Sequence, residues 1–184
     1  MNQHDMTRNM VLAALFAALT AIGAFLQIPT GTVPITLQFL FTALAGLLLG
    51  WKWGAISQLL YVGLGLLGLP VFTQGGGIGY VLQPSFGFLL GLIPAAAVIG
   101  ALTARRTGYL TVLAAVLVGD LILYAVGVPY MYLILHVYMQ SAKTFPALLA
   151  AMLVYVPGDT LKIIVVTALA PVLRRTLAKA VPNL

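Results

Sequence analysis

The chain has 184 residues, of which 62% are hydrophobic and only 7% are charged, whereas a water-soluble domain carries about 25% charged residues. This composition excludes an ordinary soluble fold. The formal net charge of +6 does not indicate nucleic-acid binding, because the 9 basic residues are spread along the chain singly or in pairs. The absence of cysteine excludes a disulfide framework, a thiolate metal site and a cysteine nucleophile.

Apolar stretches follow one another from about residue 10 to residue 172, and each is long enough to cross a bilayer. The sequence therefore predicts one all-α integral membrane domain over residues 1–184, with roughly six transmembrane helices. The expected ranges are 9–27, 36–51, 53–69, 79–103, 109–139 and 144–173. The fifth range is too long for one straight crossing, and we expect a break near residues 127–129, where Gly127 and Pro129 occur.

The distribution of basic residues predicts that both termini are cytoplasmic. With the N-terminus inside, most basic residues fall on the cytoplasmic side: Arg8, Lys52, Arg105, Arg106, Arg174, Arg175 and Lys179. The outside receives only Lys143, together with the two non-helical stretches 28–35 and 70–79. Lys162 is different, because it falls inside a predicted span.

A charged pair in the last span is the first candidate for a functional site. A charge at bilayer depth costs a few kcal/mol on insertion scales and needs a partner. Asp159 and Lys162 are three residues apart and share a helix face, which Tyr155 joins if Pro157 leaves the helical register intact. Alternatively, the two charges only neutralise each other as a structural pair.

The depth of this pair predicts on which side of the membrane the site opens. Lys162 precedes Arg174 by twelve residues, which corresponds to about 18 Å of helix. In a hydrocarbon core of about 30 Å, this distance places Lys162 toward the outer half. We therefore expect a site that opens to the outside.

Other polar residues are weaker candidates. Asp120 and Tyr124 form an i, i+4 couple in the fifth span, which serves either a ligand or a hydrogen bond between helices. Gln38, Gln74 and Gln83 lie at outer span ends or in the outer loop. They are expected to supply donors and acceptors to a pocket, or to tie helices together.

The glycine run at residues 75–79 resembles a phosphate-binding loop only superficially. No Gly-Lys-Ser or Gly-Lys-Thr follows it, so the chain does not hydrolyse ATP through a Walker motif. We expect tight turns or close backbone approach there, as a loop covering a pocket requires. His4 and His136 are isolated from each other in the sequence and predict no metal site.

Small residues form a stripe on the first predicted span. Ala13, Ala17 and Ala21 recur at four-residue spacing, with Ala14 and Ala18 beside them. Such a smooth face lets another helix approach closely. Spacing alone leaves open whether that helix belongs to the same chain or to a partner subunit.

Several ordered motifs carry a family resemblance that spans nearly the whole chain. They are Val33-Pro34-Ile35-Thr36-Leu37-Gln38, Leu44-Ala45-Gly46 through Gly50, Gly68-Leu69-Pro70-Val71-Phe72, Pro84-Ser85-Phe86-Gly87-Phe88-Leu89-Leu90-Gly91, Gly119-Asp120 with Tyr124, and Pro157-Gly158-Asp159-Thr160-Leu161-Lys162. In these motifs the chain resembles the BioY family, the biotin-binding subunits (S components) of energy-coupling factor (ECF) transporters.

This resemblance implies a six-helix subunit of a prokaryotic plasma membrane that captures biotin from outside with high affinity. It also implies association with a transmembrane coupling protein that is driven by two separate ATPase subunits. The alanine face of the first helix would dock on that coupling protein. The resemblance implies no catalytic residue and no cofactor, because biotin is the transported substrate.

The chemistry of biotin matches the candidate residues. Its carboxylate needs a cation, its ureido ring offers two N–H donors and one acceptor, and its thiophane ring and alkyl chain are apolar. The candidate partners are Lys162 for the carboxylate or the ureido oxygen, Asp159 for an N–H, Gln83, Gln38 or Gln74 for the remaining polar contacts, and Phe72, Tyr155 and Phe86 for apolar walls, with Asp120 and Tyr124 completing the expected site.

Two other classes of protein remain open from the sequence. An intramembrane enzyme would use Asp120 and Asp159 as a carboxylate pair, but the sequence offers no evident nucleophile, metal set or second base for it. A channel or purely structural membrane protein would need no ligand, and its polar residues would line a pore or tie helices together.

Overall fold

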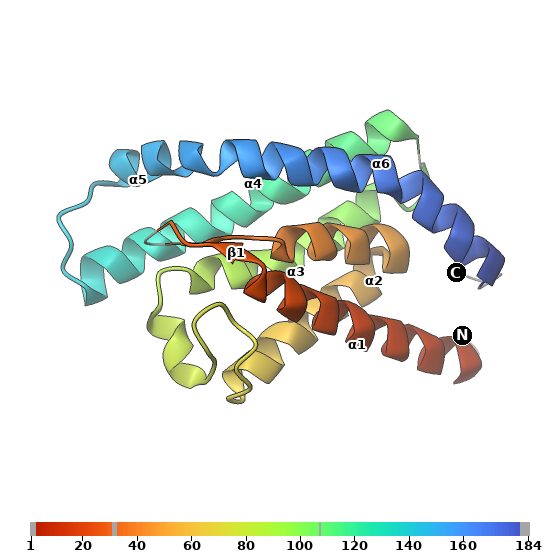
Figure 1. Ribbon diagram of the computed structural model, residues 1–184, viewed down its shortest axis with the longest axis horizontal. Coiled ribbons are helices and arrows are strands. Elements are labelled where there is room, and N and C mark those ends of the chain that lie inside the picture. The colour runs from red at the N-terminus through yellow and green to blue at the C-terminus, as the bar shows by residue number, and fades with distance from the viewer. Residues whose placement is uncertain (1–2, 31–32, 107, 181–184) are drawn as a thin grey trace.

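Figure 1 shows the fold, a computed structural model that describes residues 3–30, 33–106 and 108–180. Gly31, in the first outer stretch predicted from the sequence, lies outside these ranges. The elements are α1 (Gln3–Phe25), β1 (Gln27–Ile28), β2 (Ile35–Thr36), α2 (Gln38–Leu66), η1 (Ile78–Leu82), α3 (Phe86–Leu102), α4 (Tyr109–Leu133), η2 (Ile134–Tyr138), α5 (Phe145–Ala151), η3 (Met152–Val154) and α6 (Val156–Ala180).

Helix α2 consists of two arms that fold back on each other at Gly50. The backbone of Gly50 has φ 77° and ψ 178°, a conformation that side chains of L-residues rarely adopt. The arms are so close that a Cβ on Gly54 would lie 2.8 Å from the Cα of Gly46. The first arm (residues 38–49) and the second arm (residues 51–66) lie close to the predicted helices 36–51 and 53–69.

Buried polar side chains hold α1 to both arms of α2. Gln58 donates to Thr20 Oγ1 (3.3 Å) and to Ser57 Oγ (3.0 Å), and it accepts from Thr42 Oγ1 (2.9 Å). All four side chains are fully buried. Hydrogen bonds of this kind compensate the cost of polar groups at membrane depth, and here they join α1 and the two arms of α2 through one glutamine.

Helix α4 differs from the prediction of a break at residues 127–129. It continues through Gly127 and Pro129 to Leu133, and the irregular π-type turn η2 follows only at residues 134–138. Proline removes one backbone hydrogen bond, which membrane helices tolerate. Gly127 instead permits a close approach to α3, because a Cβ there would lie 2.4 Å from the Phe88 ring.

The last predicted helix, 144–173, is also divided in the structure. The short helix α5 passes through the 3-10 turn η3 into α6. The register survives Pro157, because the amide of Asp159 donates to the carbonyl of Tyr155 at 2.9 Å. Tyr155 and Asp159 are therefore one turn apart, as the sequence analysis required for a shared face.

The helices pack as a bundle in which most neighbours in space are also neighbours in sequence. Helix α2 packs against α1 and α3, α3 against α4, and α6 against α4 and α2. Both termini lie at the right-hand end of Figure 1, and the hairpin of β1 and β2 lies away from that end. At the terminal end, the Arg174 guanidinium donates to the carbonyls of Leu47 (2.7 Å) and Thr103 (3.4 Å).

Among the residues that the structure describes, four helices are long and apolar enough to cross a membrane: Asp5–Phe25, Gln38–Leu66, Tyr109–Tyr138 and Val156–Thr176. The shorter apolar helices are Phe86–Leu102 and Phe145–Val154. Many large apolar side chains point outward along these helices, among them Leu110, Leu121 and Leu161. Such an apolar exterior is typical of a protein whose surrounding medium is lipid.

Candidate functional site

A small cavity of about 70 Å³ lies between the hairpin, the start of α2, the loop before α3, and helices α3, α4 and α6. The residues that line it are Val33, Pro34, Ile35, Thr36, Gln38, Phe39, Thr73, Tyr80, Ser85, Phe88, Leu89, Leu92, Leu123, Tyr124, Met152, Tyr155, Asp159 and Lys162. Polar side chains reach it from α6, the hairpin, the start of α2 and the loop before α3, and apolar side chains of α3 and α4 form much of the rest. This division suits a ligand with a polar end and an apolar body.

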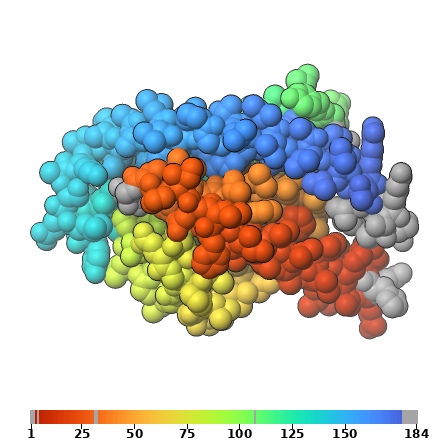
Figure 2. Space-filling model, viewed as in Figure 1, coloured from red at the N-terminus to blue at the C-terminus, as the bar shows by residue number. Residues whose placement is uncertain are grey.

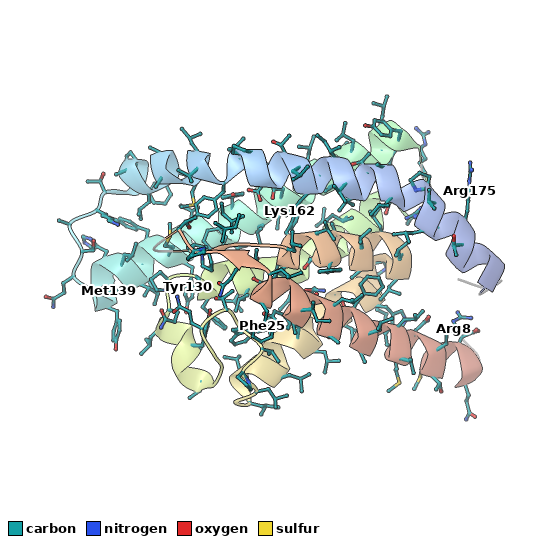
Figure 3. The ribbon with its side chains drawn as sticks, viewed as in Figure 1. Arg8, Phe25, Tyr130, Met139, Lys162 and Arg175 are labelled. Carbon is teal, nitrogen blue, oxygen red and sulfur yellow. The ribbon has the colours of Figure 1, made fainter. Side chains whose placement is uncertain are left out.

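Asp159 and Lys162 form the polar centre of the cavity. Lys162 Nζ lies 2.5 Å from Asp159 Oδ1, and both side chains are only 9% exposed. Lys162 also donates to the carbonyl of Thr36 at 3.3 Å. An ammonium has three N–H groups, so these two acceptors leave one donor for a ligand. Figure 3 shows Lys162 on the side of α6 that faces the bundle.

Tyr124 on α4 completes the environment of Asp159. Its hydroxyl donates to Asp159 Oδ2, so the carboxylate is held from α4 through one oxygen and by Lys162 through the other. The ring of Tyr124 packs edge-on against Phe88 at 5.9 Å between centroids. The site therefore joins α3, α4 and α6 around one buried charge pair.

Tyr155 ties the hairpin to the start of α6. Its hydroxyl donates to the carbonyl of Val33 and lies 2.9 Å from Thr30 Oγ1. Since Val33 and Tyr155 both line the cavity, this contact closes part of the cavity wall.

A second, more open cavity of about 560 Å³ lies on the other side of strand β2, between α1 and α6, and it shares Ile35, Thr36 and Lys162 with the first. Figure 2 shows the start of α2, in orange, between these two helices.

The structure brings together five of the residues predicted for a ligand site: Gln38, Tyr124, Tyr155, Asp159 and Lys162 all line the cavity. Asp120 does not line it. Asp120 lies one turn before Tyr124, close enough to Asp159 and Lys162 to interact electrostatically, and its buried Oδ1 has no hydrogen-bond partner among the described residues.

The structure places the other four predicted residues elsewhere. Gln74 and Gln83 are exposed, and neither lines the cavity. Phe72 and Phe86 are buried instead in an aromatic ladder of which only Tyr80 lines the cavity. The ladder runs Tyr61, Phe72, Tyr80, Phe86 and Tyr130, with centroid distances of 5.5, 4.6, 6.4 and 5.8 Å. The position of Phe72 has a packing cause, because its ring fills the space beside Gly65, where a Cβ would lie 2.0 Å from the ring.

The loop before α3 contributes cavity residues that are not among the candidates predicted from the sequence. Tyr80 lies 2.8 Å from Thr73 Oγ1 and 3.5 Å from Ser85 Oγ, and all three line the cavity. The glycines of this loop allow backbone segments to approach closely, since a Cβ on Gly76 would lie 2.1 Å from the carbonyl oxygen of Leu69. The only sequence signal for Ser85 and Phe88 was their place in the Pro84 to Gly91 motif.

The alanine stripe of α1 is split between interior and exterior. Ala13 and Ala17 are buried, at 1% and 3% exposure, and Ala21 is half-buried. Ala14 and Ala18 are exposed. Ala13 and Ala17 therefore pack within the subunit, and the exposed Ala14 and Ala18 are the part of the stripe that remains accessible to a partner.

Comparison with known proteins supplies the family. The sequence model of the BioY family matches residues 1–179. The chain belongs to the BioY family. It is 52% identical over 147 residues to a "Probable biotin transporter BioY" of Lysinibacillus sphaericus, covering 79% of this chain and 75% of the relative. It is 39% identical to a "Biotin transporter BioY" of Rhodobacter capsulatus, with 97% of each chain covered.

A solved structure matches in fold as well. The S-component for biotin from an ECF-type ABC transporter superposes with a TM-score of 0.83 and 30% identity, covering 95% of both chains. BioY proteins are transporter components rather than enzymes. The family resemblance read from the sequence motifs is thereby confirmed.

Proposed function

We propose that this chain captures biotin from outside the cell and serves as the substrate-binding subunit of an ECF-type transporter. One observation carries the proposal: a member of the BioY family buries the Asp159–Lys162 pair in a cavity that apolar side chains of α3 and α4 also line. Biotin offers the complementary chemistry, with a carboxylate, a ureido ring and an apolar body. The name of the matching S-component and the names of the relatives agree with this substrate.

Within the cavity, the spare N–H of Lys162 meets an oxygen of biotin, and Asp159 accepts from an N–H of the ureido ring. Gln38 and Thr36 supply further hydrogen bonds on the same side. Phe39, Phe88 and Leu123 surround the apolar part. The cavity of about 70 Å³ is smaller than the roughly 300 Å³ at which ligand pockets begin, so its walls move apart when biotin enters.

The membrane arrangement is part of the proposal. Counting the two arms of α2 separately, six helical segments cross the plasma membrane of a prokaryotic cell, with both termini in the cytoplasm. Basic residues near the terminal end support this orientation, among them Arg8, Arg174 and Arg175. The cavity then faces outward, and its distance from Arg174 along α6 supports this orientation.

Energy comes from other subunits. A transmembrane coupling protein with two ATPase subunits completes the transporter, and the lack of a Walker motif in the sequence agrees with energy arriving from elsewhere. The exposed part of the alanine stripe, Ala14 and Ala18, forms part of the docking surface for the coupling protein.

Calorimetric titration of biotin into the detergent-purified, ligand-free protein tests the proposal. Riboflavin and thiamine serve as controls for a vitamin-binding subunit of another specificity. We expect saturable binding of biotin alone. A folded sample that binds none of the three, or that binds a control vitamin instead, would contradict the proposal.

A further inference from the structure

A chain of hydrogen bonds runs behind the cavity from the outer loop to Gln38. The hydroxyl of Tyr61, on the second arm of α2, donates to the carbonyl of Val71 at 3.1 Å. Gln38 Nε2 donates to the Tyr61 oxygen at 2.8 Å, and Gln38 Oε1 accepts from Thr36 Oγ1 at 2.9 Å. Gln38 and Thr36 line the cavity, whereas Tyr61 does not and is only 1% exposed.

The direction of these hydrogen bonds is determined by the carbonyl at their end. A carbonyl oxygen only accepts, so the single proton of the Tyr61 hydroxyl points to Val71. The Tyr61 oxygen is then left as an acceptor, and only the NH₂ end of the Gln38 amide satisfies it. A flipped amide would bring two oxygens together with no proton between them.

We propose that Tyr61 is a positioning residue of the biotin site, whose hydroxyl determines which end of the Gln38 amide is presented to the ligand. This inference rests on the proposed function. With the amide oriented, Gln38 Oε1 and Thr36 keep one pattern of donors and acceptors along the α2 side of the cavity. The Gln38 amide is then already in one orientation before biotin binds. Binding does not have to order it, and this favours tight binding.

If Tyr61 had only a structural role, Tyr61→Phe would bind biotin as tightly as the wild-type protein. Its ring packs edge-on against Phe72 at 5.5 Å between centroids, and Tyr61→Phe keeps that packing while removing the hydroxyl. Tyr130 offers a matched control. Its hydroxyl also donates to a carbonyl of the outer loop, that of Val81 at 2.6 Å, and it also belongs to the aromatic ladder, but Tyr130 does not bond to Gln38.

The experiment measures the dissociation constant of biotin for the wild-type protein, Tyr61→Phe, Tyr130→Phe, Gln38→Leu and the Tyr61→Phe/Gln38→Leu double variant, with thermal stability recorded for each. We expect Tyr61→Phe to weaken binding about fivefold, the size of one lost hydrogen bond. Tyr130→Phe is expected to change affinity less than about twofold. In the Gln38→Leu background, Tyr61→Phe should have no further effect.

Three results would overturn the inference. They are an unchanged affinity in Tyr61→Phe, an equal loss in Tyr130→Phe, and an undiminished effect of Tyr61→Phe in the Gln38→Leu background. Each would show that the hydroxyl does not act through Gln38. Absence of biotin binding by the folded wild-type protein is a separate outcome, because it would remove the proposed function itself.

Discussion

Tyr124 and Asp159 join helices α4 and α6 at the polar centre of the cavity, where the phenol donates to one carboxylate oxygen while Lys162 binds the other. The two residues are 35 positions apart in the sequence. Their contact places the charge of Asp159 at a defined point on the cavity wall. The predictions below begin with this group of side chains and then move outward through the fold.

Removing one member of the buried charge pair should strongly reduce both the stability of the protein and its binding of biotin. Asp159→Asn or Lys162→Met leaves the other charge buried and uncompensated, and we expect a loss of about 3 kcal/mol of stability together with loss of biotin binding. The double variant should recover much of the stability but not the binding. Thermal unfolding and calorimetry measure the two properties separately.

The pair of Arg8 and Asp5 is the control for this prediction. It has the same three-residue spacing at 3.3 Å, but its side chains are 26% and 31% exposed. Asp5→Asn should change stability by less than about 1 kcal/mol. If single variants of Asp159 or Lys162 bound biotin as tightly as the wild-type protein, their assignment to the site would be wrong.

Tyr124→Phe should weaken biotin binding without unfolding the protein. The ring keeps its packing on Phe88. The Asp159 carboxylate, however, loses the hydrogen bond that it accepts from the Tyr124 hydroxyl, and a hydrogen bond to a charged acceptor is worth about 2 kcal/mol. We expect a roughly tenfold or greater rise in the dissociation constant. Tyr109→Phe, at an exposed position at the start of α4, is the control and should bind normally. Equal affinities of the two variants would count against the role given to Tyr124.

Gly50→Ala should destabilise the reversal of α2. No atom lies within 4 Å of a Cβ built at this position, so the cost arises only from the backbone, with φ 77° and ψ 178°, and amounts to about 1–3 kcal/mol. Gly63→Ala is the matched control, since Gly63 lies inside the second arm and also has nothing within 4 Å. Alanine is favoured there by helix propensity. A melting temperature that fell more for Gly63→Ala than for Gly50→Ala would refute this account.

Arg174→Leu should loosen the terminal end of the bundle. The guanidinium spans two helix ends by donating to the carbonyls of Leu47 and Thr103. Its removal leaves these acceptors without that donor, and we expect a loss of about 2 kcal/mol. Arg174→Lys should keep only part of this stability, because an ammonium cannot reproduce the forked set of N–H donors of the guanidinium. Arg175→Leu, at an exposed neighbour, should have little effect on the melting temperature.

The split alanine stripe predicts two different phenotypes. Ala18→Leu, on the exposed side, should leave biotin binding intact and reduce co-purification with the coupling protein. Ala17→Leu, at 3% exposure, should destabilise the subunit itself by about 1–3 kcal/mol through overpacking. The measurements are calorimetry, thermal unfolding and co-purification from membranes. Unchanged co-purification of Ala18→Leu would remove Ala18 from the docking surface.

Much of this protein could be predicted from the sequence, because the relevant signals are local. The apolar runs indicated a helical membrane protein, and the motifs indicated the BioY family, which the comparisons confirmed. The spacing of Asp159 and Lys162 placed them on one helix face, and the structure shows them in contact. A charge within an apolar helix stands out by itself, and helical periodicity determines its near neighbours.

The tertiary structure alone decided which apolar and uncharged residues reach the cavity. Phe72 and Phe86 were expected in its walls but are not among the residues that line it, whereas Phe88 and Tyr80 are. In a water-soluble helix, polarity marks the outer face, but in this chain most side chains are apolar on both faces. Because lipid and protein interior are both apolar, the sequence pattern does not distinguish them, and only the packing of one helix against another determines which side chains turn inward.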